Sequence, residues 1–246
     1  MNICLFNKSE IDNPLHQNDE RAIHIRKVLH KKEGESFDAG IINGMAGIAT
    51  ITKISETGEI YFSFTETKNG KELYPLTLII GFPRPIQLRR LLRDVASLGV
   101  KKIILTGTEL GEKSYLNSNI ITDGSAHKML LDGSVQAAST HIPELVFCKS
   151  LKESIDLLDD LNSSIRISLD NKNPETNLGD FLRNSSIKNQ NIIAAIGSER
   201  GWTDNERIFL KKAGFTHCSM GIRILRTETA ATVATSIILN EMGFLQ

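Results

Sequence analysis

Two loops hold the residues whose types and spacing are best suited to chemistry. They read "IGSERGWT" at 196–203 and "MGIRILRTET" at 220–229. Each follows an apolar run, has a glycine where a ligand could approach the backbone, and leads into a predicted helix. Free N–H groups at a helix N-terminus favour an anion. The loops therefore suggest a ligand site, although each can also be interpreted as an ordinary solvated turn and helix cap.

The elements around these loops predict one sheet that positions both of them. Alternation of strands and helices is typical of an α/β domain with a mostly parallel sheet, and ligands of such sheets bind beyond the carboxyl ends of the strands. Apolar runs predict strands at 76–82, 101–107, 144–150, 165–170, 191–197 and 217–221. Helical spacing predicts helices at 86–99, 125–139, 151–161, 178–185 and 203–214, and a last helix after the second loop. Thr203 and Glu206 predict a capping box at the start of the helix at 203–214.

The first 70 residues have a different pattern. A short basic helix is predicted at 20–31, and β-prone runs at 36–42, 46–54 and 59–66 are separated by turn signals. This pattern indicates a small β-barrel or meander, joined by a linker at 68–72. We therefore expect two domains, 1–72 and 73–246.

Composition excludes several classes of protein. No run approaches the length of a membrane span, and the N-terminal residues lack the pattern of a signal peptide. Cys4, Cys148 and Cys218 are far apart, which argues against a disulfide framework and against a metal site. The sequence has neither GxGxxG nor GxxxxGK[ST], so an unrelated nucleotide-dependent α/β enzyme is disfavoured. We expect a cytoplasmic protein with reduced thiols.

Charge is balanced overall but concentrated locally. With 29 basic and 29 acidic residues, the net charge of zero neither indicates nor excludes nucleic acid. Two segments, 24–32 and 84–102, are nevertheless rich in lysine and arginine. They could present a basic face to RNA phosphates or simply form solvated helix surfaces.

Taken together, the two loops resemble the SPOUT methyltransferases, and most closely the RsmE family, which methylates N3 of a uridine in small-subunit (16S) ribosomal RNA. The resemblance rests on "IGSERGWTDNE" and "MGIRILRTETA", and it extends to "HIRKVLHKKEGESFDAG", "LRRLLRDVASLGVKKIIL" and "SVQAASTHIPEL". Ser198 stands where the family usually has proline, and Arg200 where it usually has a second glycine. If that glycine requires a positive φ, Arg200 would be strained.

The resemblance implies an architecture and a set of partners. The expected fold is a SPOUT-type C-terminal α/β domain with a trefoil knot, plus an N-terminal PUA-like β-barrel that holds RNA. S-adenosylmethionine is the implied cofactor, and the implied partners are small-subunit ribosomal RNA or the 30S subunit and a second copy of the chain in a homodimer. No metal and no membrane are implied.

The resemblance also assigns roles to individual residues. The cofactor pocket maps to Leu169, Ile196, Gly197, Glu199, Gly201, Met220, Gly221, Ile224, Leu225 and Thr229. The residues expected to contact RNA phosphates are Arg26, Lys27, Lys31, Lys32, Arg84, Arg89, Arg90 and Arg93. For catalysis we hypothesise that Arg226 stabilises the uracil anion, and that Glu228 or Glu199 takes the N3 proton or orients Arg226. The departures at Ser198 and Arg200 leave one alternative, a non-catalytic RNA-binding or ribosome-assembly factor that keeps the fold.

Overall fold

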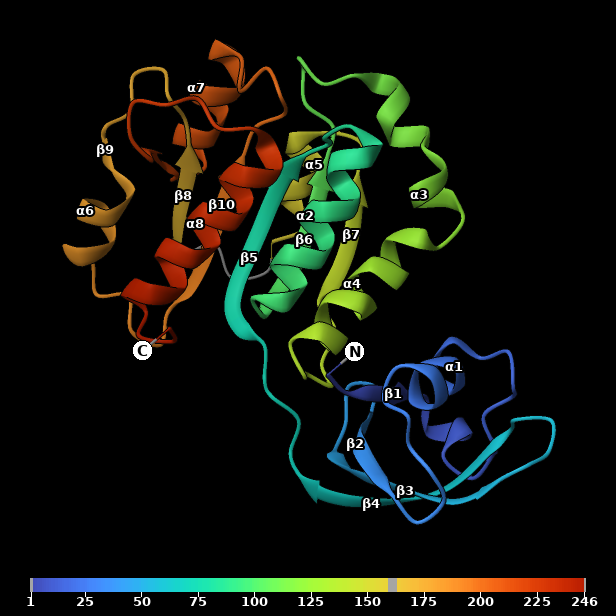
Figure 1. The fold of residues 1–246 in the computed structure, drawn as a ribbon. Helices are drawn as coiled ribbons and strands as arrows, with labels where there is room; N and C mark the ends of the chain where they lie inside the picture. The colour runs from blue at the N-terminus through green and yellow to red at the C-terminus, as the bar shows by residue number, and fades with distance from the viewer. Residues whose placement is uncertain (1, 159–162, 246) are drawn as a thin grey trace. The chain divides into compact units, whose positions relative to one another are not determined.

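The computed structural model describes residues 2–158 and 163–245, which divide into two compact units (Figure 1). The first unit runs up to Glu72 and includes the segment Ser134–Ile142. The second comprises Leu73–Gly133 and the chain from Pro143 onward. The chain thus leaves the first unit at residue 72 and returns to it once, after the glycine at 133.

The first unit is a four-stranded sheet with one short helix. Its elements are β1 (Cys4–Phe6), a 3₁₀ turn (Lys8–Glu10), α1 (Glu20–Lys27), β2 (Ser36–Ile41), β3 (Ala46–Ile54) and β4 (Ile60–Lys68). The strands lie in the order β1-β2-β3-β4, with β1 parallel to β2 and the other pairs antiparallel. Phe6, Ile25, Ile51 and Ile60 are fully buried between sheet and helix.

The three strands predicted for this unit are present, but its helix is shorter than the predicted 20–31. Helix α1 ends at Lys27, and the next residues, Val28 and Leu29, are exposed. Helix length here follows from packing, because Ala22 and Ile25 are the buried positions of α1. Strand β1 was not predicted, because three residues are too few to show an alternation.

The second unit is built on a seven-stranded sheet in which every pair is parallel. Its strands are β5 (Tyr74–Gly81), β6 (Val100–Thr106), β7 (Glu144–Cys148), β8 (Ser164–Leu169), β9 (Thr176–Asn177), β10 (Asn191–Ile196) and β11 (Thr216–Ser219), in the order β7-β6-β5-β10-β8-β11-β9. Its helices are α2 (Pro85–Ser97), a 3₁₀ turn (Lys113–Asn117), α3 (Asn119–Thr122), α4 (Ser125–Gln136), α5 (Leu151–Asp156), α6 (Leu178–Arg183), α7 (Asp204–Lys212) and α8 (Thr227–Glu241). The predicted α/β class with a mostly parallel sheet is confirmed.

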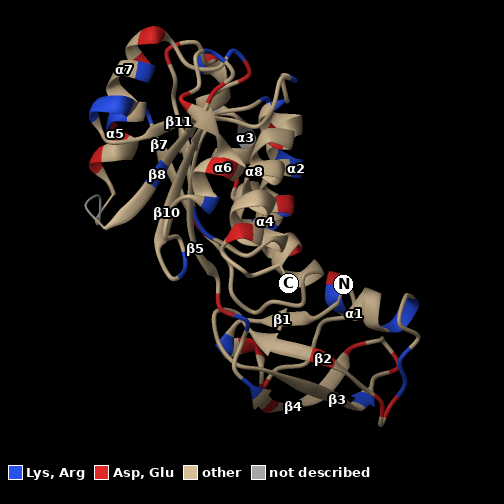
Figure 2. Ribbon diagram, turned by 90° about the vertical axis from the view of Figure 1, so that its left-hand side faces the viewer, with Lys and Arg blue, Asp and Glu red and all other residues tan. Residues whose placement is uncertain are grey.

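Helices cover both faces of this sheet, as its apolar strands require. Figure 2 shows α2 and α8 on one side and α5 and α7 on the other. Helix α2 packs against α8, and the opposite face holds a buried cluster that includes Ile79, Ile104, Trp202 and Leu210. The helix predicted at 151–161 ends at Asp156, and part of its remainder lies outside the described residues.

Local signals end and begin the helices that flank the two loops. Thr203 and Glu206 form the predicted capping box at the start of α7, and Gly214, with φ +80, follows its end. The N-cap residue of α8 is Arg226, whose side chain makes no capping hydrogen bond, so the alternative interpretation of the second loop as a helix cap with Thr227 as N-cap does not hold. Thr227 is instead the first helical residue and is buried.

Candidate functional site

A cavity of about 470 Å³ lies where the carboxyl ends of β8 and β10 meet the two polar loops. Eight of the ten residues that the resemblance assigns to the cofactor line it: Leu169, Ile196, Gly197, Glu199, Gly201, Met220, Ile224 and Leu225. Gly221 and Thr229 do not line it and are exposed. The roles of all ten stay predictions, but one sheet edge brings most of them together from three separate segments.

A tight turn shapes the first loop. The N–H of Gly201 donates to the carbonyl of Ser198 at 2.8 Å, and Gly201 has φ +72. A Cβ added to Gly197 would lie 2.9 Å from the backbone of Gly201, so this position needs a glycine for a close approach. The strain expected at Arg200 is absent, because the left-handed conformation falls on Gly201 and not on Arg200.

Buried Trp202 connects this turn to the neighbouring strand. Its indole Nε1 donates to the carbonyl of Leu169 at 3.2 Å, and its side chain is 2% exposed. Its hydrogen bond fixes the end of β8 relative to the loop after β10, and both of these segments line the cavity.

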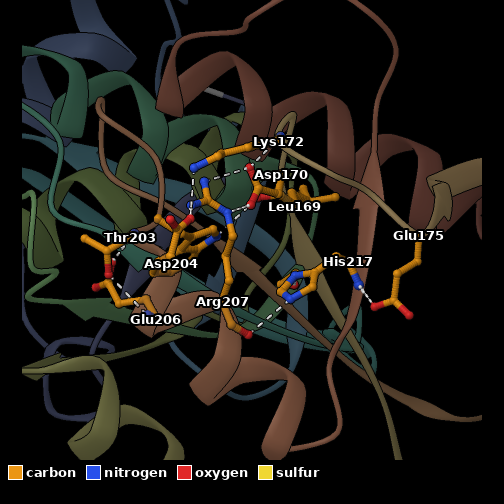
Figure 3. Close-up of polar contacts among 11 residues, drawn as sticks. Leu169, Asp170, Lys172, Glu175, Thr203, Asp204, Glu206, Arg207 and His217 are labelled. Carbon is orange, nitrogen blue, oxygen red and sulfur yellow. Dashed lines mark hydrogen bonds and ion pairs between the residues drawn. The ribbon is translucent and has the colours of Figure 1, made fainter.

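The cavity also has a charged wall that the sequence analysis missed (Figure 3). Asp170, Lys172 and Arg207 line it. The guanidinium of Arg207 pairs with the carboxylate of Asp170 and, through Nη1, with Asp204 at 2.9 Å, while Lys172 Nζ reaches Asp204 at 2.9 Å. The side chains of Asp170 and Arg207 are only 6% and 16% exposed, so this pair is shielded from solvent.

Hydrogen bonding shifts the pKa values in this charged wall. The hydrogen bond from Arg207 to Asp170 raises the pKa of Arg207. The hydrogen bond from Lys172 lowers the pKa of Asp204, whose carboxylate is exposed to solvent. Both shifts favour the charged forms of Arg207 and Asp204. No sequence signal predicts it, because Asp170 and Arg207 are 37 residues apart.

A buried histidine supports the strand beneath this wall. His217 Nδ1 contacts the hydroxyl of Ser168, and its Nε2 lies 3.2 Å from the carbonyl oxygen of Arg207 (Figure 3). A carbonyl oxygen only accepts, so Nε2 carries the hydrogen, and in the neutral ring Nδ1 accepts from Ser168. The imidazole thus links β11 to β8 and α7, which contribute Leu169 and Arg207 to the cavity lining.

The three residues proposed for catalysis do not lie together in the cavity. Glu199 lines it, and its carboxylate pairs at 3.2 Å with Arg84 Nε, a residue assigned to RNA. Arg226 and Glu228 do not line it: Arg226 is exposed, and Glu228 is half-buried in the first turn of α8. Both flank Thr227, which does line it, so they stand at the rim.

The residues expected to contact RNA phosphates differ in whether their charged groups already have partners within the chain. In the first unit, Arg26 is half-buried and donates to the carbonyls of Ala22 and Gln17, whereas Lys27, Lys31 and Lys32 have no ion pair among the described residues. In the second unit, the four arginines Arg84, Arg89, Arg90 and Arg93 are exposed along α2 and the residue before it. Arg93 pairs with Asp132 at 3.3 Å. Arg26, Arg84 and Arg93 thus already use their guanidinium groups for contacts within the chain.

Two expected absences concern membranes and metals. Across residues 2–158 and 163–245, no helix has the length and apolar character needed to cross a bilayer. The same residues contain no group of three or more histidine, cysteine, aspartate or glutamate side chains placed to hold a metal ion.

The model of the RNA methyltransferase domain family matches residues 70–239, a span that contains the parallel sheet and the cavity. A solved structure with the same fold is the ribosomal RNA small subunit methyltransferase E of Neisseria gonorrhoeae bound to S-adenosyl methionine. It has a TM-score of 0.78 and 21% identity, and the match covers 98% of this chain and 97% of that one.

Two curated relatives are closer in sequence. The ribosomal RNA small subunit methyltransferase E of Treponema pallidum is 41% identical, over 97% of this chain and 91% of the relative. The ribosomal RNA small subunit methyltransferase E 1 of Borreliella burgdorferi is 36% identical, over 97% of each. The chain belongs to the ribosomal RNA small subunit methyltransferase E family.

Proposed function

We propose that this protein transfers a methyl group from S-adenosylmethionine to N3 of a specific uridine in small-subunit ribosomal RNA. The observation that carries the proposal is the cavity at the carboxyl edge of the parallel sheet, where the two loops bearing the family motifs meet. Its volume of about 470 Å³ falls within the roughly 300–1,000 Å³ usual for small-molecule sites.

The residues present fit the cofactor. A glycine is needed at 197 for the close turn, whereas a Cβ at Gly201 would meet nothing within 4 Å, so the turn leaves open space on that side. Leu169, Ile196 and Leu225 supply apolar surface for an adenine ring, and backbone groups of the loops are available for its edge. The bound cofactor supplies an electrophilic methyl group.

The protein's own residues must deal with the N3 proton of uracil. N3 becomes nucleophilic when its imide proton is lost, and the negative charge then spreads to the two carbonyl oxygens of uracil. Arg226, exposed at the N-cap of α8, donates to that charge in our proposal. Glu228 or Glu199 takes the proton or orients Arg226; Glu199 already pairs with Arg84 at the cavity rim.

The test of this mechanism is the change Arg226→Ala, assayed at saturating cofactor. We expect turnover to fall about 10²–10³-fold, as for loss of one preorganised donor, with cofactor affinity unchanged. Arg183→Ala is the matched control, because Arg183 is an exposed arginine that pairs with Asp180 and Glu241 on α6 and α8, away from the cavity. Near-normal turnover of Arg226→Ala would remove this residue from the mechanism.

The remaining parts of the proposal concern assembly. Ile222 and Ile224 are 102% and 86% exposed in the second loop, which supports a homodimer that covers them. The trefoil knot and the PUA-like character of the first unit rest on the family resemblance, and a cytoplasmic location rests on the composition of the chain. Phosphate contacts by the basic residues predict RNA binding that weakens as salt rises.

One alternative is a non-catalytic RNA-binding or assembly factor with the same fold. Calorimetry with S-adenosylmethionine separates the two, because an assembly factor has no need to bind it. Mass spectrometry of ribosomal RNA from cells lacking the gene then tests the substrate. Loss of a single N3-methyluridine supports the proposal, and an unchanged RNA contradicts it.

A further inference from the structure

A second cavity, which we call the aromatic cavity, opens at the same carboxyl edge of the sheet. It encloses about 540 Å³ beyond the ends of β5, β6 and β7, and its walls include Phe82, Leu116, Phe147, Lys113 and Lys149. It shares no lining residue with the cofactor cavity beyond β8 and β10. The proposed transfer reaction, as described so far, makes no use of it.

The aromatic cavity presents a ring to solvent. Phe147 is 38% exposed, although phenylalanine is usually buried. Buried Phe82 lies behind it, with the ring planes 13° apart and the centroids separated by 6.3 Å. The exposed ring thus has a nearly parallel aromatic neighbour behind it. An exposed aromatic ring on an open cavity is suited to a flat ring that stacks on it.

The rim of the aromatic cavity is positively charged. Lys113 and Lys149 are exposed, and in the described part of the chain neither ammonium pairs with a carboxylate. Glu112 is the one carboxylate among its lining residues, so these three side chains sum to one positive charge. A ligand with a flat ring and a negative charge satisfies both features, and a nucleotide has both.

The two cavities are close along the chain. Phe82 lines the aromatic cavity, and Arg84, two residues later, pairs with Glu199 of the cofactor cavity. Two residues of extended chain span at most roughly 7 Å. Stacked nucleotides advance about 3.4 Å along one strand. The linings of the two cavities also adjoin at Gly81, because a Cβ added there would lie 2.4 Å from the backbone nitrogen of Ser198 in the cofactor cavity and 2.9 Å from Thr108 in the aromatic cavity. A nucleotide next to the methylated one can therefore lie over the aromatic cavity.

We propose that the aromatic cavity binds a nucleotide neighbouring the target uridine, with its base stacked on Phe147 and its phosphate near Lys113 and Lys149. This inference rests on the proposed function and names a second binding site for the same RNA. A base held beside the target would help to keep the target uridine out of its own stack, which N3 methylation of a paired uridine requires.

The test begins with wild-type protein, small-subunit ribosomal RNA and S-adenosylmethionine. Mass spectrometry of the product locates the methylated uridine, and a synthetic RNA fragment around it becomes the probe. For Phe147→Ala we expect the Kd for this fragment to rise about 5- to 100-fold, with the affinity for S-adenosylmethionine unchanged. Phe147→Trp keeps an aromatic surface and should bind the RNA within a few-fold of wild type.

A matched control separates stacking on RNA from general damage. Phe244 is 37% exposed and also stacks on a second aromatic ring, that of Tyr74, at 4.4 Å. Tyr74 begins β5, so this pair lies at the opposite, amino edge of the sheet. Phe244→Ala should leave RNA affinity unchanged. Likewise, Lys149→Ala should lower the slope of log Kd against log salt by about one, and Lys101→Ala, at the start of β6, should not.

Abasic RNA makes the test specific. Fragments that lack the base on the 5′ or the 3′ side of the target are compared with the intact fragment. On the fragment that lacks the stacked base, Phe147→Ala should have no further effect, because the contact is already gone.

An equal loss of affinity on intact and abasic RNA, or no loss of affinity at all, overturns the inference. So does a change in oligomeric state of Phe147→Ala, which would make the cavity a subunit interface. Failure of wild-type protein to bind S-adenosylmethionine would instead overturn the proposed function and this inference with it.

Discussion

The turn at 197–201 allows the reasoning about the cofactor cavity to be tested with two glycine substitutions that act differently. A Cβ at Gly197 would lie 2.9 Å from the Cα and carbonyl carbon of Gly201, which are backbone atoms. Ordinary contact begins at 3.4 Å, so Gly197→Ala must separate the two ends of the turn by about 0.5 Å. A Cβ at Gly201 would meet nothing within 4 Å, but φ there is +72.

These geometries predict different effects on cofactor affinity and stability. Gly197→Ala shifts the backbone that forms the cavity wall, and a displacement of about 1 Å at a site can cost about 10²-fold. We therefore expect at least about a 10-fold weaker Kd for S-adenosylmethionine, with a loss of about 1–3 kcal/mol of unfolding free energy from overpacking. Gly201→Ala costs about 1–2 kcal/mol for the left-handed conformation, and the stiffer unfolded chain offsets about 0.4–1 kcal/mol of it.

Calorimetry with S-adenosylmethionine and thermal unfolding of both variants provide the measurements. The expected result is a large loss of affinity for Gly197→Ala and a smaller one for Gly201→Ala, with the greater loss of stability also in Gly197→Ala. Wild-type affinity in Gly197→Ala would refute the assignment of this turn to the cofactor. A greater loss of affinity in Gly201→Ala would show that the backbone conformation of residue 201, and not the close approach at residue 197, determines the affinity for S-adenosylmethionine.

Two further predictions follow from the ion pairs of the two units. Asp170→Ala leaves the shielded guanidinium of Arg207 without its main partner, so we expect a loss of about 3 kcal/mol and a fall in Tm of about 6–12 °C by circular dichroism. A double variant with Arg207→Met should recover part of that loss, and strictly additive losses would contradict the pairing. In the first unit, hydrogen bonds from Arg21 lower the pKa of Glu10 and of Asp19. Their contribution to stability is thus present above the unfolded values of about 4 and is lost as pH falls through the lower folded values. Arg21→Met should speed hydrogen exchange in α1 at pH 7, with a difference from wild type that shrinks below about pH 4; a constant difference would contradict this origin.

Sequence patterns were sufficient where the cause of the structure is local. The alternation of apolar runs predicted the parallel α/β sheet, and the capping box at Thr203 and Glu206 marked the start of α7. Patterns were less reliable at the ends of elements. Helix α1 stops at Lys27, and α8 is capped at Arg226, because burial of particular side chains decides where a helix ends. Short β1 and β9 are held by pairing with neighbours and carry no periodicity of their own.

The sequence by itself determined the fold class, the family and the two loops that meet at the cavity, because each is written in residues close together along the chain. Only the tertiary structure decided which distant side chains share that cavity. Asp170 and Arg207 pair across 37 residues, and Arg84 reaches Glu199 across 115. The tertiary structure likewise showed that the positive φ of the first loop falls on Gly201, so Arg200 is tolerated. Parallel strands bring their carboxyl ends to one edge, and that juxtaposition has no signature in local sequence.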